Sequence, residues 1–359
     1  MLDDLVQFLA CIQPRFEQFL FKDNTIDGIL FQTETWTPLL LKAKIVWNRI
    51  MKNTDSFIQL SAEVQNGLKN NLPIVCLEST VISHGLPYPD NLKTIQSMQD
   101  VIRSVGVIPV VIGIVNGKIK MGLSDEEITL FSNDSKNVMK VNRAEIPYCL
   151  TKKLNGATTV SATAFCAAKV GIRIFATGGI GGVHRDVQDT FDISSDLYEL
   201  SKIPTLVICA GAKSILDIPR TLEYLETFSV PVIGYKTAHF PLFYSATSSY
   251  KLSQTVNSSE EAAKLAHFHF KLQSGGMIIA QPIPIDSSLN AETIEEAILV
   301  ATEDCNLKGI KGKEVTPYIL ARLTELTHGK TLTANKELLV NNAKLAAQIS
   351  FELSMDTPL

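Results

Sequence analysis

From about Phe57 onward, continuous apolar runs of strand length alternate with longer stretches of helical pattern. The runs lie at 73–78, 107–115, 172–179, 205–211, 231–235 and 276–284. Such runs between helices are typical of strands buried on both faces of a sheet. The helical patterns lie at 91–104, 124–132, 155–170, 259–272, 290–304, 316–327 and 335–353, and Ser124 with Glu127 has the spacing of a capping box. We therefore predict a layered α/β/α domain with a largely buried mixed sheet.

Residues 1–55 have a different character. They contain both tryptophans, Trp36 and Trp47, and two weak amphipathic patterns around 2–12 and 39–52. They contain no catalytic constellation. We predict that residues 1–55 form an accessory, mostly helical N-terminal extension and that residues 56–359 form the catalytic domain. A partner-binding or membrane-surface role of the extension is the alternative.

Composition narrows the class of protein. The formal net charge of −4 weighs against a nucleic-acid binder, which usually carries a basic patch. The six cysteines form no C-x-x-C pair and several lie in apolar runs, so we expect buried, reduced thiols in a cytoplasmic protein. No apolar run reaches the roughly 18 residues of a membrane span. The start MLDD lacks the basic region of a signal peptide.

The segment TLVICAGAKSILDI places Lys213 directly after an apolar strand that ends in Ala-Gly-Ala. The carboxyl ends of strands in α/β sheets open into the ligand crevice. A lysine with small and apolar neighbours is poorly solvated there, and desolvation favours the neutral amine. Such an amine can attack a carbonyl and form a Schiff base. A lysine that reaches solvent from a helix N-terminus is the other interpretation of this segment.

The segment CLESTVISHGLPYP places Glu78 at the end of another apolar strand. A carboxyl group in an apolar pocket has a raised pKa and suits general acid–base work. An ordinary strand-end acid paired with a surface lysine is the alternative.

A glycine-rich segment, ATGGIGGVHRDVQDTFDISSDL, offers close backbone approach to a ligand, and His184 and Arg185 follow the glycines. Glycine amides next to a basic pair suit phosphate or sugar oxygens. Further on, Asp192, Ser194 and Asp196 present oxygens at alternate positions, which suits a hard cation such as Mn²⁺ or Mg²⁺. The glycines do not follow the G-x-G-x-x-G spacing of a dinucleotide fold.

Two polar segments are ambiguous when taken alone. Lys140 lies with Arg143 in VMKVNRAEIP, which can be a solvated basic loop or a ligand contact. Asn335, in LTANKELLVNNAKLA, can be the N-cap of the last helix, or it can match the donors and acceptors of a pyrimidine edge.

Taken together, these segments closely resemble one family, the pseudouridine-5′-phosphate glycosidases, also called the indigoidine synthase A-like family. The resemblance covers about 57–355. It rests on LESTVISHGLPYPDN, GKIKMGLSDEEI, NGATTVSATAF, FATGGIGGVHR, TFDISSDLYEL, ICAGAKSILDIPRTLEYLETF, GKEVTPYILARLTELT and NKELLVNNAKLA. The sequence departs from the family pattern at Asn142, Ala246 and Gln281.

The resemblance implies a reversible conversion of pseudouridine 5′-phosphate and water to uracil and ribose 5-phosphate. It implies that Lys213 is the nucleophile, that Glu78 is the proton donor and that Asp192 binds Mn²⁺. The implied substrate-binding residues are Lys140, Val160, Ser194, Ser195, Asp196 and Asn335. It also implies a homotrimer that acts on a small molecule, with no nucleic acid or membrane as partner.

The chemistry of the bond explains the need for a lysine. Uracil is attached through carbon and is a poor leaving group, so the carboxylate pair of ordinary glycosidases would have to expel a carbanion. An amine that adds at C1 of the opened ribose instead yields an iminium that accepts electrons as the bond breaks. A lysine Schiff-base aldolase acting on another sugar phosphate and a non-enzymatic scaffold are the competing interpretations.

Overall fold

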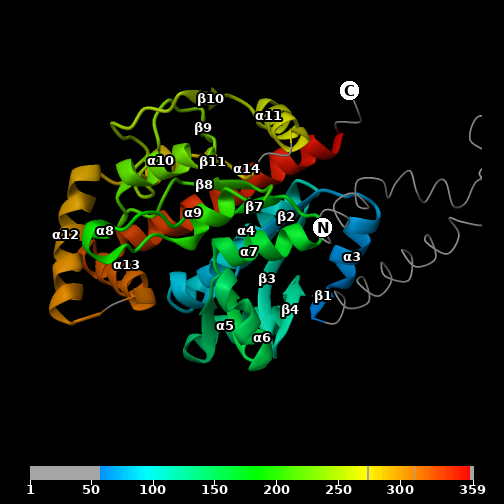
Figure 1. The fold of residues 1–359 in the computed structure, drawn as a ribbon, viewed down its shortest axis with the longest axis horizontal. Coiled ribbons are helices and arrows are strands. Elements are labelled where there is room, and N and C mark those ends of the chain that lie inside the picture. The colour runs from blue at the N-terminus through cyan, green and yellow to red at the C-terminus, as the bar shows by residue number, and fades with distance from the viewer. Residues whose placement is uncertain (1–56, 273–274, 311, 356–359) are drawn as a thin grey trace, which may run out of the picture. The chain divides into compact units, whose positions relative to one another are not determined.

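The structure of the chain is a computed structural model, and it describes residues 57–272, 275–310 and 312–355 (Figure 1). The extension predicted at 1–55, with Cys11 and both tryptophans, lies outside the described residues. Residues 57–359 form one compact unit. Its architecture confirms the predicted α/β fold with a central mixed sheet and helices on its faces.

One mixed sheet contains all the described strands. They are β1 (Ile58–Leu60), β2 (Ile74–Glu78), β3 (Ile108–Val115), β4 (Lys118–Met121), β5 (Val138–Val141), β6 (Asn155–Thr158), β7 (Ile174–Ala176), β8 (Leu206–Cys209), β9 (Val232–Tyr235), β10 (Gln254–Val256) and β11 (Met277–Ala280). The main order is β1-β4-β3-β2-β7-β8-β11-β9-β10, with β6 also paired to β3 and β5 paired to β6. Only the pairs β3–β4 and β3–β6 among these described strands are antiparallel.

The helices flank this sheet. They are α3 (Ala62–Lys69), α4 (Asp90–Ser104), α5 (Asp125–Asn133), α6 (Ile146–Thr151), α7 (Val160–Lys169), α8 (Val187–Thr190), α9 (Ser195–Leu200), α10 (Ile218–Thr227), α11 (Ser259–Lys271), α12 (Ala291–Leu307), α13 (Val315–Leu326) and α14 (Lys330–Met355). Helix α14 packs on α4 and α11 and contacts β2, β7 and β8, whereas α7 contacts β2, β3 and α9 (Figure 1).

The core follows from the apolar runs. Every residue of β2, β8 and β11 is buried, as expected for central strands covered on both faces. Cys76, Cys149, Cys166, Cys209 and Cys305 are free and buried, which confirms the expected burial for the described cysteines. In the part of the chain that the structure describes, no helix is long and apolar enough to cross a membrane.

Three details of the sequence prediction are tested at residue level. The capping box of Ser124 and Glu127 is present at the start of α5. The helix expected at 155–170 is wrong in its first turn, because Asn155–Thr158 pairs with β3 and β5 as strand β6. The last helix begins at Lys330 rather than near Asn335, so Asn335 lies inside the helix and is not its N-cap.

Candidate active site

Three neighbouring parallel strands end at the same edge of the sheet and bring distant segments together. Strand β2 ends at Glu78, β7 leads to Thr177, and β8 leads through Ala210 and Gly211 to Lys213. Because β7 lies between β2 and β8, Thr177 stands between the two segments that the sequence marks as catalytic. This is the crevice position expected for an α/β sheet.

Glu78 is held in an almost closed environment and is only 5% exposed. The hydroxyl of Thr80 donates to Glu78 Oε2, and the hydroxyl of Thr177 donates to Oε1. Burial raises the pKa of the Glu78 carboxyl above its ordinary value, while nearby Lys213 and the two hydroxyls oppose that rise. A buried carboxyl with a raised pKa can deliver a proton near neutral pH.

Lys213 lies in the loop between β8 and α10. Gly211 has a φ of +88°, a conformation that favours glycine, and it turns the chain away from β8. The Lys213 backbone N–H donates to the Ile180 carbonyl at 3.1 Å, so the lysine loop is joined to the glycine-rich loop. The Lys213 side chain is half-buried and interacts electrostatically with Glu78.

A second lysine approaches from β5. Lys140 is half-buried, and its pKa is lowered by burial and then by the charge of Lys213, while Asp196, Glu78 and Glu314 oppose the shift. The structure therefore gathers four of the predicted site residues, Glu78, Lys140, Asp196 and Lys213, into one electrostatic cluster.

The N-terminus of α7 closes one side of this cluster. Val160 is its first residue and is buried. The buried Asp196 carboxylate accepts hydrogen bonds from the backbone N–H of Ser161 at 2.8 Å and of Gly181 at 2.9 Å. A Cβ on Gly181 would collide with Ser194 and Asp196, so only glycine fits this approach. Ser195 Oγ lies 3.1 Å from Ser161 Oγ.

The side-chain oxygens of Asp192, Ser194 and Asp196 do not converge on a common point that could hold a cation. Both oxygens of Asp196 bind backbone amides, and Ser194 Oγ caps α9 by accepting from the Asp196 N–H at 3.2 Å. The Asp192 carboxylate is 45% exposed, and its Oδ2 lies 3.7 Å from His184 Nε2. Within the described ranges, no group of three or more His, Cys, Asp or Glu residues could hold a metal.

Asp192 nevertheless fits one kind of cation site. Hard divalent cations are often held by one or two carboxylates while keeping several waters, and a half-exposed carboxylate leaves room for those waters. The donor set at this position therefore fits a hydrated cation bound through Asp192. It does not fit a cage built from Asp192, Ser194 and Asp196 together.

Helix α14 reaches the same edge of the sheet. Asn335 is 7% exposed and lies in the second turn of this helix. Two turns later, the fully buried Asn342 donates through Nδ2 to the Thr177 carbonyl at 2.8 Å. Sequence reasoning missed Thr80, Thr177 and Asn342. The position of Thr177 between a strand and the glycines is the one signal that could have found it.

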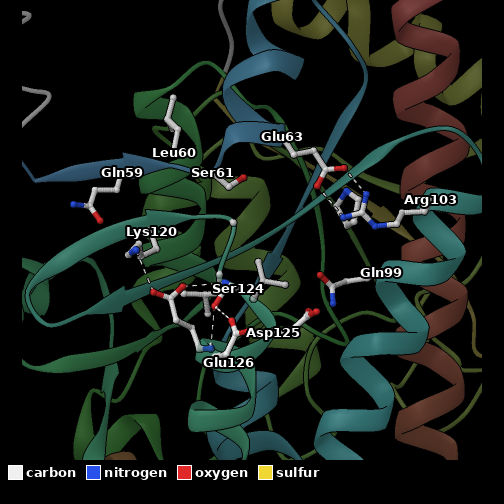
Figure 2. Close-up of a pocket in the computed structure, with 15 residues that line it drawn as sticks. Gln59, Leu60, Ser61, Glu63, Gln99, Arg103, Lys120, Ser124, Asp125 and Glu126 are labelled. Atoms are coloured by element: carbon white, nitrogen blue, oxygen red, sulfur yellow. Dashed lines mark hydrogen bonds and ion pairs between the residues drawn. The ribbon is translucent and has the colours of Figure 1, made fainter.

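A separate cavity of about 820 Å³ lies beside β1, α4 and the start of α5. Figure 2 shows Arg103 paired with Glu63 at this cavity. Lys120 forms an ion pair with Glu127 at 3.1 Å. None of the predicted site residues lines it. Its two cationic residues are both paired, so we assign it no part in the chemistry.

The cysteines near the cluster are poor nucleophiles. Burial raises the pKa of the Cys209 thiol, next to the lysine loop, to about 12. Cys166 on α7 is raised to a pKa of about 12 by the same cause. A thiol with such a pKa stays protonated near neutral pH. These two thiols are therefore unsuited to act as nucleophiles.

Comparisons with known proteins all point to one protein family. The family described as "Indigoidine synthase A like protein" matches residues 63–352. A pseudouridine-5′-phosphate glycosidase of Caldanaerobacter subterraneus subsp. tengcongensis is 49% identical over 299 residues, which is 83% of this chain and 97% of that protein. The protein of that name from Escherichia coli K12 is 47% identical over 305 residues, covering 84% and 97%.

Two solved structures share the fold. The prealnumycin C-glycosynthase AlnA in complex with ribulose 5-phosphate has a TM-score of 0.77 at 34% identity, covering 84% of this chain and 98% of its own. An indigoidine synthase A-like protein from Thermotoga maritima has a TM-score of 0.76 at 35% identity, covering 83% and 97%.

Proposed function

The chain belongs to the indigoidine synthase A-like family and is an enzyme, and on this premise we propose that it cleaves the C–C glycosidic bond of pseudouridine 5′-phosphate. The products are uracil and ribose 5-phosphate, and the reaction is reversible. The observation that carries the proposal is the meeting of buried Glu78 with Lys213 and Lys140 at the carboxyl edge of the sheet. The names of the relatives and of the C-glycosynthase support chemistry at a C-glycosidic bond.

In the proposed first step, the Lys213 amine attacks C1′ of the ribose. The C1′–O4′ bond breaks, and Glu78 gives its proton to O4′, so the sugar opens while uracil stays attached to C1′. The raised pKa of Glu78 favours the protonated carboxyl that this task requires. The carboxylate that results is stabilised by Thr80, Thr177 and the nearby lysines.

In the second step, the Glu78 carboxylate takes a proton from the new secondary ammonium of Lys213 and delivers it to C5 of uracil. The nitrogen lone pair of Lys213 forms the C1′=N bond, and the electrons of the C1′–C5 bond restore the C5=C6 bond of the departing uracil. Water then hydrolyses the Schiff base. Its oxygen becomes the aldehyde oxygen of ribose 5-phosphate, and Lys213 is released. Read backwards, the same steps join uracil to the sugar.

The remaining side chains hold the substrate in this proposal. Lys140, Val160, Ser194, Ser195 and Asp196 line the sugar-phosphate side, and Asn335 reads the uracil edge. Asp192 would hold Mn²⁺ through its carboxylate, and the ion, when bound, would supply positive charge that orders the phosphate end or acidifies water for proton transfer. The Nε2 atom of His184 lies 3.7 Å from the Asp192 carboxylate.

Uracil release from pseudouridine 5′-phosphate tests the proposal, because an aldolase with the same lysine would release no uracil. The assay is run with and without Mn²⁺ on the wild type, on Asp192→Asn and on Asp189→Asn, a matched control on the same exposed segment. We expect Asp192→Asn to raise the half-saturating Mn²⁺ concentration about tenfold or more, with the control unchanged. Absence of uracil release would reject the function, and an unaltered Mn²⁺ response of Asp192→Asn would reject the metal assignment.

A further inference from the structure

The place of Lys213 depends on a loop rather than on a regular element. The loop lies between Cys209, the last residue of β8, and Ile218, the first residue of α10. On the side that precedes the lysine, it is joined to the glycine-rich loop. The Ile180 N–H donates to the Gly211 carbonyl at 3.1 Å, and the Lys213 N–H donates to the Ile180 carbonyl.

On the side that follows the lysine, one side chain binds the next two carbonyls. Arg185 Nη2 donates to the Ser214 carbonyl and Nε to the Ile215 carbonyl, each at 3.2 Å. Ser214 and Ile215 are buried, and buried carbonyls need hydrogen-bond partners. The Ser214 hydroxyl has no hydrogen-bond partner in the described part of the chain, so this side chain does not set the loop.

Glu295 on α12 orients the arginine. Both Nη atoms of Arg185 bind the Glu295 carboxylate, with Nη2 at 2.9 Å from Oε2. The side chains are 32% and 49% exposed, so this pair adds little to stability. The pair matters more for geometry. The guanidinium is planar, so once the carboxylate holds one edge, the remaining N–H groups point in fixed directions.

We propose that Arg185 is a positioning residue for Lys213, acting through the two carbonyls that follow the lysine. The inference rests on the proposed function, in which Lys213 attacks C1′. Misplacing a reacting group by about 1 Å can cost about 100-fold in rate. The guanidinium is occupied by Glu295 and the lysine loop, which argues against the phosphate contact that the His184–Arg185 pair suggested in the sequence.

Arg185→Lys, Arg185→Gln and Glu295→Gln in the full chain test this role. Lysine keeps the charge but cannot span two carbonyls and a carboxylate. The matched controls are Arg322→Lys and Arg322→Gln, because Arg322 is 34% exposed and pairs with Asp304 and Glu325 instead of the lysine loop. Two readouts are needed: kcat and KM for uracil release, and the rate at which borohydride traps ribose 5-phosphate on Lys213.

We expect both Arg185 variants to lower kcat and the trapping rate about 10- to 100-fold, with KM changed less than about threefold. Glu295→Gln gives a smaller fall in the same quantities, and the Arg322 variants stay within about twofold of the wild type. If the Arg185 variants do not fold, Glu295→Gln decides alone, and its wild-type kcat would overturn the inference.

Two other results would overturn it as well. The first is a kcat in Arg185→Lys that equals the control. The second is a raised KM at unchanged kcat, with lysine rescuing the loss caused by glutamine, which would mark Arg185 as a phosphate contact. If borohydride traps no sugar on Lys213 of the wild type, the proposed mechanism itself fails. The wild-type trapping experiment therefore distinguishes failure of the mechanism from failure of the positioning role of Arg185.

Discussion

Glu78 lies under two opposing influences. Burial raises its pKa, and the hydroxyls of Thr80 and Thr177 with the charge of Lys213 lower it again. A buried carboxyl of this kind is suited to exchange protons and costs folding free energy whenever it is ionised. Ionisation of Glu78 therefore destabilises the folded state, and this effect grows as pH rises.

Replacing Glu78 by glutamine separates these two effects. The folded-state pKa of Glu78 is raised above its unfolded value. Its favourable contribution is therefore complete below the ordinary glutamate pKa and is lost as pH rises through the folded pKa. We expect Glu78→Gln to lose activity about 100- to 10,000-fold, yet to gain stability relative to the wild type as pH rises from 5 to 8.

Denaturant unfolding at both pH values measures that difference. The control is Glu337→Gln on the exposed face of α14, measured in the same way. A stability difference between Glu78→Gln and the wild type that stays constant over this range would contradict the account of Glu78.

Residues at strand ends could be predicted, and their partners could not. Glu78 and Lys213 each follow an apolar run, so the sequence alone predicts that both lie at the carboxyl edge of the sheet. Thr177 is separated from Glu78 by 99 positions, and only the order of β2 and β7 brings them together. The alternate spacing of Asp192, Ser194 and Asp196 suits a cation, but spacing alone does not reveal that backbone amides of other segments bind both Asp196 oxygens.

At the scale of elements, α14 connects the end of the chain to the centre of the site. It contacts β2, β7 and β8, the strands that present Glu78, Thr177 and the lysine loop. Its hydrogen bond from Asn342 to the Thr177 carbonyl lies fully inside the protein. Helix α14 therefore supports the turn from which Thr177 reaches Glu78.

The substitution Asn342→Leu removes this hydrogen bond while keeping the volume of the side chain nearly constant. We expect the free energy of unfolding to fall by about 1–3 kcal/mol, because the Thr177 carbonyl is left buried without its Asn342 donor. Asn341→Leu is the control, since that half-buried neighbour donates to the Pro282 carbonyl at 3.2 Å instead. If denaturant unfolding gave equal losses of unfolding free energy for the two variants, the Asn342 hydrogen bond would contribute no more to stability than that of Asn341.

Element boundaries were harder to predict than element types. Most apolar runs proved to be strands, because length and composition distinguish buried strands well. The stretch Asn155–Thr158 was assigned to a helix because its residues continue smoothly into α7. Tertiary pairing with β3 and β5 decides otherwise.

At the scale of the whole molecule, a net-negative chain gathers two lysines at one edge of its sheet. A phosphorylated substrate needs only such local positive charge. The layered fold could be predicted almost entirely, because alternating runs and helical patterns leave few arrangements. The role of residues 1–55 could not, because those residues carry no chemical pattern.

We expect a variant that begins at Thr54 to keep its uracil-releasing activity within about threefold of the full chain. Every residue of the proposed site lies at Glu78 or beyond. Circular dichroism checks folding, and normal folding with most activity lost would mean that the extension completes the site.

We expect the full chain to assemble as a homotrimer, as the family resemblance implies. Light scattering at micromolar concentration should then give about three times the chain mass of 39.4 kDa. A mass close to that of a single chain would reject this assembly.

In the proposed reaction, Lys213 is the nucleophile. Borohydride reduction in the presence of ribose 5-phosphate, followed by peptide mass spectrometry, identifies the lysine that binds the sugar. Lys140 is the natural internal comparison, because it is half-buried in the same cluster with a lowered pKa. We predict one added sugar phosphate on Lys213, retained in Lys140→Ala and absent in Lys213→Ala. A label on Lys140, or no label on any lysine of an active enzyme, would contradict the account.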